Sequence, residues 1–126
     1  MHGRLHHVIL DCPEPGVLAA FYRALLGHPV TYDDGDFAVV SVDDRTSGLA
    51  FQRSPDHRPP TWPGPAVPQQ IHFDVMVDDL AAARTAVLAL GATELPGGDH
   101  VFADPAGHPF CLIPLPGWAP PVDPTG

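Results

Sequence analysis

Lysine and asparagine do not occur in this chain, and all six of its basic residues are arginines. The absence of lysine excludes any mechanism that needs a Schiff base between a lysine amine and a carbonyl substrate. Acidic residues outnumber basic residues by 15 to 6, which gives a formal net charge of −9. A chain this acidic is repelled by a phosphate backbone, so we expect no nucleic-acid partner.

Cysteine, glutamate and long apolar runs are also scarce. The two cysteines, Cys12 and Cys111, are too few for a disulfide framework and lack the spacing of a zinc finger. The only two glutamates are Glu14 and Glu94, so a site that demands glutamate has few places to find one. No apolar run approaches the length of a membrane span, and no signal-peptide pattern is present. We therefore expect no membrane partner and a cytoplasmic location.

The chain contains one sequence pattern that occurs twice. A strand-like run with a histidine, then a helix ending in Leu-Gly, then further strand-like runs begin near residue 5 and return near residue 70. His7 precedes Gly27 by 20 positions, and His72 precedes Gly91 by 19 positions. Each copy is too small to bury its own sheet well, so we predict that the two pack as one domain with a cleft between them.

The apolar periodicity predicts the order βαβββ in each copy. Pro15 suits a first helical turn, Gly27 is an expected helix terminator, and Asp78 is predicted to cap the second helix. The expected elements are a strand over 5–11, a helix over 15–26 and strands over 28–32, 37–42 and 48–53, then a strand over 70–77, a helix over 79–90 and strands over 92–95, 100–103 and 109–113.

Proline marks the boundaries between these parts. Six prolines fall within residues 54–68, which predicts a stiff extended connector, although a proline-rich ligand motif is an open alternative. The whole chain is then a single domain. Its predicted parts are module one (4–54), a proline-rich linker (55–68), module two (69–115) and a proline-rich tail (116–126).

Several motifs fall in an order that resembles a known family. They are His7 in the first strand, Phe21-Tyr22 followed by Leu25-Leu26-Gly27, His72 in the fifth strand, Asp78-Asp79-Leu80 at the second helix, and Asp104-Pro105-Ala106-Gly107 before the last strand. With the paired βαβββ order, they look like the vicinal oxygen chelate superfamily. That group includes glyoxalase I, extradiol dioxygenases, fosfomycin-resistance enzymes and bleomycin-resistance proteins. The resemblance implies an α+β fold whose two modules pair into a cupped eight-stranded mixed sheet around a central cleft, and it implies a homodimer.

The resemblance also implies a divalent metal held by the first and last strands of each module. His7 and His72 match the first-strand positions, while Gln52 and Cys111 match the last-strand positions where the metalloenzymes carry glutamate. A coordinated Cys thiolate favours zinc over magnesium, and iron, nickel and manganese remain candidates. The alternative is that both histidines line a metal-free pocket. For Cys111 we favour the reading that it is a small buried apolar residue.

Asp74 is the candidate catalytic residue. It shares a strand face with His72 and Met76, as Ile9 does with His7, because side chains alternate along a strand. Asp74 is either a general base or a carboxylate that orients His72 through a hydrogen bond, and we favour the second role. Met76, Ile9, Trp62 and His108 are the predicted substrate-binding residues.

Three functions follow from these observations. The first is a metal-dependent lyase, isomerase or oxygenase that acts on a small oxygen-rich molecule. Glyoxalase I activity itself is not expected, because that enzyme uses a glutamate base and this chain has none at a matching place. The second is a non-catalytic protein that sequesters a drug or metabolite, as bleomycin-resistance proteins do; its acidic surface would suit a cationic ligand. The third is a ligand-binding module that keeps the fold and has lost the site.

Overall fold

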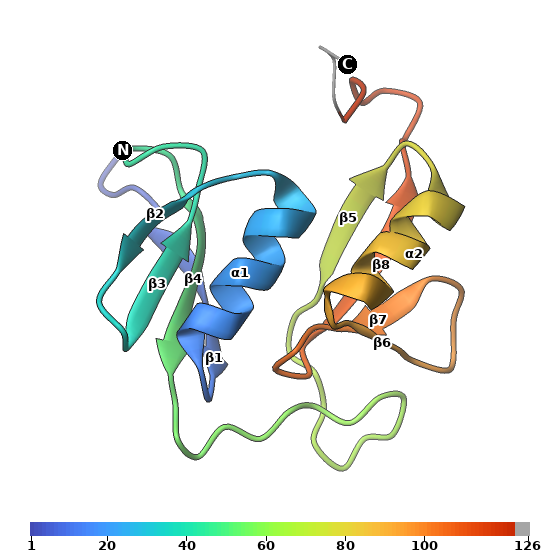
Figure 1. Cartoon of the computed structure of the whole chain (residues 1–126), viewed down its shortest axis with the longest axis horizontal. Coiled ribbons are helices and arrows are strands. Elements are labelled where there is room, and N and C mark those ends of the chain that lie inside the picture. Colours follow the sequence, from blue (N-terminus) through green and yellow to red (C-terminus); the bar gives the residue numbers. More distant parts are fainter. Residues whose placement is uncertain (123–126) are drawn as a thin grey trace. The chain divides into compact units, whose positions relative to one another are not determined.

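A computed structural model (Figure 1) describes residues 1–122, so the last four residues of the predicted tail lie outside the described part. The chain divides into two compact units, Met1–Arg58 and Pro59–Gly126. Each repeats the order βαβββ, which confirms an α+β fold of two tandem modules. The elements are β1 (His7–Cys12), α1 (Pro15–Leu26), β2 (Val30–Asp33), β3 (Phe37–Val40), β4 (Gly48–Arg53), β5 (Phe73–Val77), α2 (Leu80–Leu90), β6 (Thr93–Glu94), β7 (Val101–Ala103) and β8 (Pro109–Pro114).

Unit 1, residues 1–58, is a four-stranded mixed sheet with α1 on one face (Figure 1). The strand order is β1-β4-β3-β2, with β1 parallel to β4 and the other pairs antiparallel. Leu18, Phe21 and Tyr22 of α1 are buried, and the Tyr22 ring stacks on Phe51 of β4 at a centroid distance of 5.5 Å. The helix-facing side of this sheet is therefore a well-filled apolar core.

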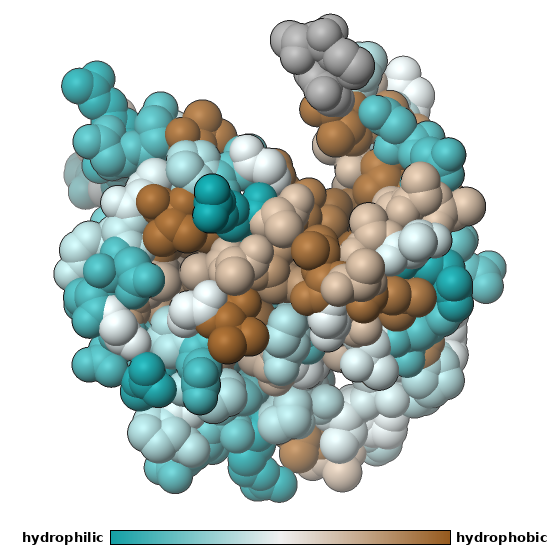
Figure 2. Space-filling view, viewed as in Figure 1, coloured by the Kyte–Doolittle hydropathy of each residue, from teal (hydrophilic) through white to brown (hydrophobic). Residues whose placement is uncertain are grey.

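Unit 2, from Pro59 onward, repeats the same sheet order as β5-β8-β7-β6, with β5 parallel to β8. Phe102 and Phe110 are fully buried and stack with a centroid distance of 5.8 Å. Helix α2 contributes less, because Val87 is the one buried residue within it and Leu90 is 38% exposed. Figure 2 shows brown and pale atoms over this helix, as expected for its alanine- and leucine-rich sequence.

The helix ends follow the sequence closely. Helix α1 begins with Pro15 and ends at Gly27, whose φ of 70° is left-handed. Helix α2 begins one residue later than predicted, because Asp79, not Asp78, is the cap and accepts the backbone N–H of Ala82 at 2.9 Å. Gly27 at the end of α1 and Asp79 at the start of α2 thus pair with backbone groups that the helices themselves leave unpaired.

The boundary between the two units falls after Arg58, within the residues predicted as a linker (55–68). Thr61 and Val67 close a loop: the Thr61 N–H donates to the Val67 carbonyl at 2.7 Å, and the Val67 N–H donates to Thr61 Oγ1 at 2.9 Å. The Trp62 indole N–H donates to the Pro96 carbonyl at 2.6 Å. The second half of the linker is therefore fastened to unit 2 by hydrogen bonds.

Within residues 1–122, no helix is both long enough and apolar enough to cross a membrane. The cytoplasmic location, the homodimer and the cleft between modules stay predictions.

Candidate functional site

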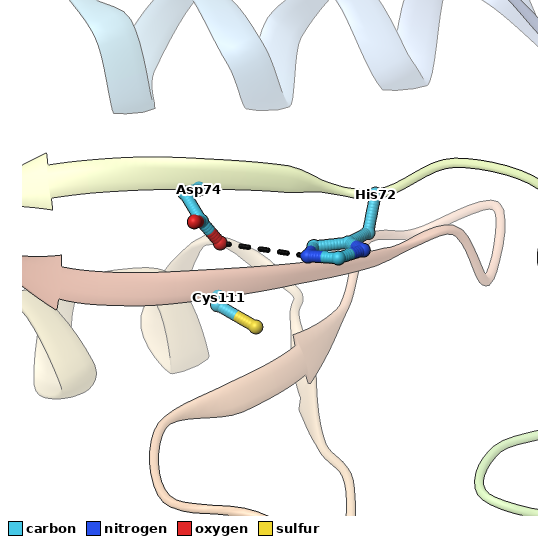
Figure 3. A group of neighbouring side chains, drawn as sticks. All are labelled: His72, Asp74 and Cys111. Carbon is cyan, nitrogen blue, oxygen red and sulfur yellow. Dashed lines mark ion pairs between the residues drawn. The ribbon is translucent and has the colours of Figure 1, made fainter.

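Three side chains that the sequence singled out lie together in unit 2 (Figure 3). Asp74 lies in β5, His72 immediately precedes this strand, and Cys111 lies in the neighbouring strand β8. One potential ligand atom from each lies within 4.8 Å of the others. His72 and Asp74 are exposed, and Cys111 is half-buried. The cluster is therefore accessible to an ion and to a small molecule.

The strand register explains why these residues meet. Asp74 is paired with Cys111 across the parallel β5–β8 ladder, and paired residues project from the same face of a sheet. Their neighbours Phe110 and Leu112 face the opposite way and are buried in the core. His72 lies two residues before Asp74, just outside β5, which begins at Phe73 and not at Gln70 as predicted. Alternation still places its side chain next to that of Asp74.

The spacing of His72 and Asp74 is compatible with two ligands of a small tetrahedral cation. His72 Nε2 and Asp74 Oδ1 are 3.6 Å apart, which is too long for a good hydrogen bond. Ligand atoms around a tetrahedral zinc ion with bonds of 2.0–2.3 Å lie about 3.4 Å apart. The His–Asp separation is close to that value, so this pair needs little movement to share an ion.

The donor set is one imidazole, one carboxylate and one thiol. A thiolate with an imidazole suits zinc, whereas magnesium and calcium prefer oxygen ligands throughout. The iron site of extradiol-type oxygenases uses two histidines and one carboxylate, and this cluster supplies one histidine. The residues present therefore fit zinc better than iron, and they leave a fourth position for an external ligand.

The electrostatic environment of Cys111 depends on what occupies the cluster. Burial raises the pKa of the Cys111 thiol, and the negative charge of Asp74 raises this pKa further. In the metal-free protein the thiol therefore keeps its proton at neutral pH. A bound cation has the opposite sign and stabilises the thiolate, so metal binding at this cluster must release a proton.

In unit 1, His7 and Gln52 are not brought together. His7 is paired with Gly48 in the β1–β4 ladder, and Gln52 is paired with Asp11, four positions further along. That offset is roughly 13 Å at the usual rise per residue. Gln52 instead lines a shallow, open hollow next to Arg53 and Asp36.

The His7 ring is also engaged in a hydrogen bond within unit 1. Its Nδ1 accepts the backbone N–H of Gly48 at 3.0 Å. Burial, with a smaller contribution from His6, lowers the pKa of His7. A neutral imidazole that accepts at Nδ1 carries its proton on Nε2, so it has no lone pair left for a metal. His7 could bind a metal only if this hydrogen bond broke.

The predicted substrate-binding residues lie in different surroundings. Ile9 is 47% exposed and Met76 is 38% exposed, each on the face that also carries the histidine of its unit. Trp62 is half-buried and held by Pro96, as described above. His108 lies in the turn before β8, where its backbone N–H donates to Asp104 Oδ1 at 3.0 Å. Their roles in ligand binding stay predictions.

Unit 1 contains a pocket that the sequence reasoning missed, with a volume of about 510 Å³. Phe37 and Val39 of β3 line it, and Ala38 between them pairs with the helix-facing Phe51. The pocket therefore lies on the sheet face opposite α1. Tyr32 of β2, three aspartates and two histidines complete most of its wall. The alternation of Phe37 and Val39 was the signal in the sequence that could have located this face.

The comparisons with known proteins agree with this architecture. A high-resolution crystal structure of a glyoxalase-related enzyme from Fulvimarina pelagi has a TM-score of 0.66 and 14% identity, covering 92% of this chain and 91% of that chain. The fosfomycin resistance protein FosX from Listeria monocytogenes has a TM-score of 0.64 and 15% identity, covering 93% and 97%. A bleomycin-binding protein complexed with bleomycin has a TM-score of 0.56 and 19% identity, covering 90% and 99%.

At these identities the solved structures show the fold alone, and no curated protein matches the chain. The model of the Glyoxalase-like domain family matches residues 7–113, which is most of the sequence and includes both histidine-bearing strands. The chain therefore belongs to the glyoxalase-like domain family, within the vicinal oxygen chelate superfamily.

Proposed function

We propose that this protein is a zinc-dependent lyase or isomerase that binds a small oxygen-bearing molecule at His72, Asp74 and Cys111. The observation that carries this proposal is the placement of three ligand atoms of suitable chemistry within 4.8 Å on the exposed face of one sheet. His72, Asp74 and Cys111 would hold the zinc ion, which would supply Lewis-acid chemistry toward a substrate oxygen.

The protein residues have separate tasks in this proposal. Cys111 and His72 supply the ligands that select zinc, and Asp74 neutralises part of the added charge. The one glutamate in the sequence of unit 2, Glu94, is engaged in an ion pair with Arg84. This ion pair supports the expectation that glyoxalase I chemistry proper is absent.

The test is a zinc titration of full-length protein purified without an affinity tag and stripped with a chelator. We expect one zinc ion per chain, with affinity lost in Cys111→Ala and in His72→Ala. Cys12→Ala is the matched control, because Cys12 is the other thiol and is buried in unit 1. Cobalt in place of zinc should give a thiolate charge-transfer band that is absent in Cys111→Ala. Equal zinc affinity in Cys111→Ala and the parent protein would refute the site.

A second function is favoured by a separate observation, the pocket of unit 1. This pocket contains none of the three cluster residues, so it needs no metal to bind a ligand. A volume of about 510 Å³ is in the range of small-molecule sites. The similarity to a bleomycin-binding protein supports a role in sequestering a drug or metabolite without turnover.

A further inference from the structure

We propose that the pocket of unit 1 binds a flat organic cation, an aromatic or conjugated ring that carries a protonated amine. This inference rests on the second proposed function and names its ligand class. It does not depend on the zinc cluster, which consists of residues of unit 2.

The apolar wall suits a flat ring. Tyr32 and Phe37 lie edge to face with a centroid distance of 6.4 Å, and Val39 lines the pocket beside them. Tyr32 is 53% exposed, so its ring is accessible to a ligand. Aromatic faces attract both other rings and organic cations.

The first negative charge is fixed in place by the turn between β2 and β3. Asp34 Oδ1 accepts the backbone N–H groups of Asp36 and Phe37 at 2.9 Å and 2.8 Å. Its Oδ2 accepts the Tyr32 hydroxyl at 3.0 Å. These hydrogen bonds lower the pKa of Asp34, so the carboxylate next to the aromatic wall is ionised at neutral pH. The charge is preorganised and needs no rearrangement to meet a cation.

The loop after β3 supplies two more charges. Asp43 Oδ1 accepts the backbone N–H groups of Arg45 and Thr46 at 2.9 Å and 2.7 Å. Asp44 also lines the pocket and is exposed. The lining residues include His6 and His7 but no arginine, and burial lowers the pKa of His7. The wall therefore carries three carboxylates and no arginine to balance them.

The uncharged polar groups of the pocket, on Thr31 and Ser41, also favour a ligand that donates hydrogen bonds. Ser41 donates its hydroxyl to the Asp43 carbonyl at 2.7 Å, so the 2.8 Å contact between Ser41 and Thr31 must use the Thr31 proton. Thr31 Oγ1 is left as an acceptor at the pocket wall. A protonated amine offers up to three donors and would satisfy these acceptors, whereas a carboxylate ligand would meet repulsion.

The experiment compares three naphthalenes that differ in charge, using zinc-stripped, full-length protein. The probes are 2-naphthylmethylammonium, neutral 2-naphthylmethanol and anionic 2-naphthoate, and binding is followed by calorimetry and by the NMR signals of Tyr32 and Phe37. We expect the cation to bind roughly tenfold more tightly than the alcohol, because several exposed carboxylates each contribute a modest amount. The anion should bind most weakly, and added salt should narrow the difference.

Two variants make the test specific. Asp44→Asn removes one pocket charge without disturbing the turns held by Asp34 and Asp43, and should weaken cation binding about two- to fivefold. Asp56→Asn makes the same charge change outside the pocket lining and should leave binding unchanged. Equal weakening by both variants would mean that only net charge matters, which would overturn the proposal.

The remaining outcomes separate the ligand class from the site itself. Binding of the alcohol as tightly as the cation would show a ligand pocket with the wrong class assigned. No shift of the Tyr32 and Phe37 signals with any probe would remove the pocket as a ligand site, and the second proposed function with it. Neither outcome bears on zinc binding by unit 2.

Discussion

The two units share one backbone plan and differ at two side chains that decide their chemistry. In unit 1, His7 is followed two residues later by Ile9, which is paired with Ala50 of β4. In unit 2, His72 is followed two residues later by Asp74, which is paired with Cys111 of β8. The three equivalent positions therefore hold His7, Ile9 and Ala50 in unit 1 and His72, Asp74 and Cys111 in unit 2. In unit 1 the histidine has two apolar neighbours, and in unit 2 it has a carboxylate and a thiol.

This difference shows that the repeated scaffold does not by itself make a metal site. The βαβββ order and the parallel pairing of first and last strands are the same in both units. In unit 1 the histidine Nδ1 accepts a backbone N–H, and the histidine lines a pocket together with residues of β2 and β3. In unit 2 the histidine faces two polar neighbours.

The units also differ in how their helices pack. Five residues of α1 are buried, whereas Val87 is the one buried residue of α2. Removing a helix side chain should therefore have the larger effect in unit 1. We expect Leu18→Ala in α1 to lower the free energy of unfolding by about 2–5 kcal/mol, because Leu18 is 1% exposed.

Leu90→Ala in α2 is the matched change for this prediction. Leu90 is partly exposed, so the loss should be well under about 2 kcal/mol. Urea unfolding monitored by circular dichroism measures both variants. Equal losses would show that α2 is packed as firmly as α1 and would break the comparison.

Replacing each histidine tests the metal difference directly. His72→Ala should lower zinc affinity by more than the roughly 100-fold that loss of an outer partner can cost, because a direct ligand disappears. His7→Ala should leave zinc affinity unchanged, because its Nδ1 is bonded to Gly48. Competition with a chromophoric chelator measures both constants. A large loss in His7→Ala would restore His7 as a metal ligand.

The two helix terminators offer a finer test. Gly27 has a φ of 70° and Gly91 a φ of 112°. Asparagine adopts left-handed conformations near the first value, so Gly27→Asn should cost less than about 1 kcal/mol of unfolding free energy. Gly91→Asn should cost about 1–3 kcal/mol, because its backbone lies outside that region. Thermal unfolding of the two variants side by side gives the difference, and equal melting temperatures would contradict it.

The smallest expected effect is a change in the stability of unit 1 at acidic pH. Hydrogen bonds within their turns lower the pKa values of Asp34 and Asp43, so the folded state favours their ionised forms. The stability that they contribute is present above the unfolded carboxylate pKa of about 4, and it is lost as the pH falls through the lower folded pKa. Asp43→Asn should flatten this acid-side decline, and Asp56→Asn should not. The folded fraction of unit 1, followed by its NMR signals between neutral and acidic pH, measures this decline.

The fold was predictable because its signals are local. Pro15 and Gly27 bound α1 as expected, and the turn residues separate the strands at nearly the predicted places. The errors lie at element edges. Asp79 took the cap predicted for Asp78, and β5 began at Phe73, because neighbouring aspartates and neighbouring strand residues have nearly equal intrinsic preferences.

The candidate site was predictable only in part. Alternation along β5 was enough to place Asp74 beside His72, and the resemblance to a family pointed to Cys111. Sequence reasoning favoured a buried apolar role for Cys111, whereas the structure places its sulfur near His72 and Asp74. The burial of a residue near a strand end depends on how its neighbours cover it, and this is not a local property.

The sequence by itself determined the repeated α+β plan, because apolar periodicity, glycine and proline act over a few residues. It also determined the negative charge and the absence of lysine chemistry. Only the tertiary structure decided which of the candidate ligands meet. Strand register sets distances between residues far apart in the chain, and it joins Asp74 to Cys111 while it separates His7 from Gln52.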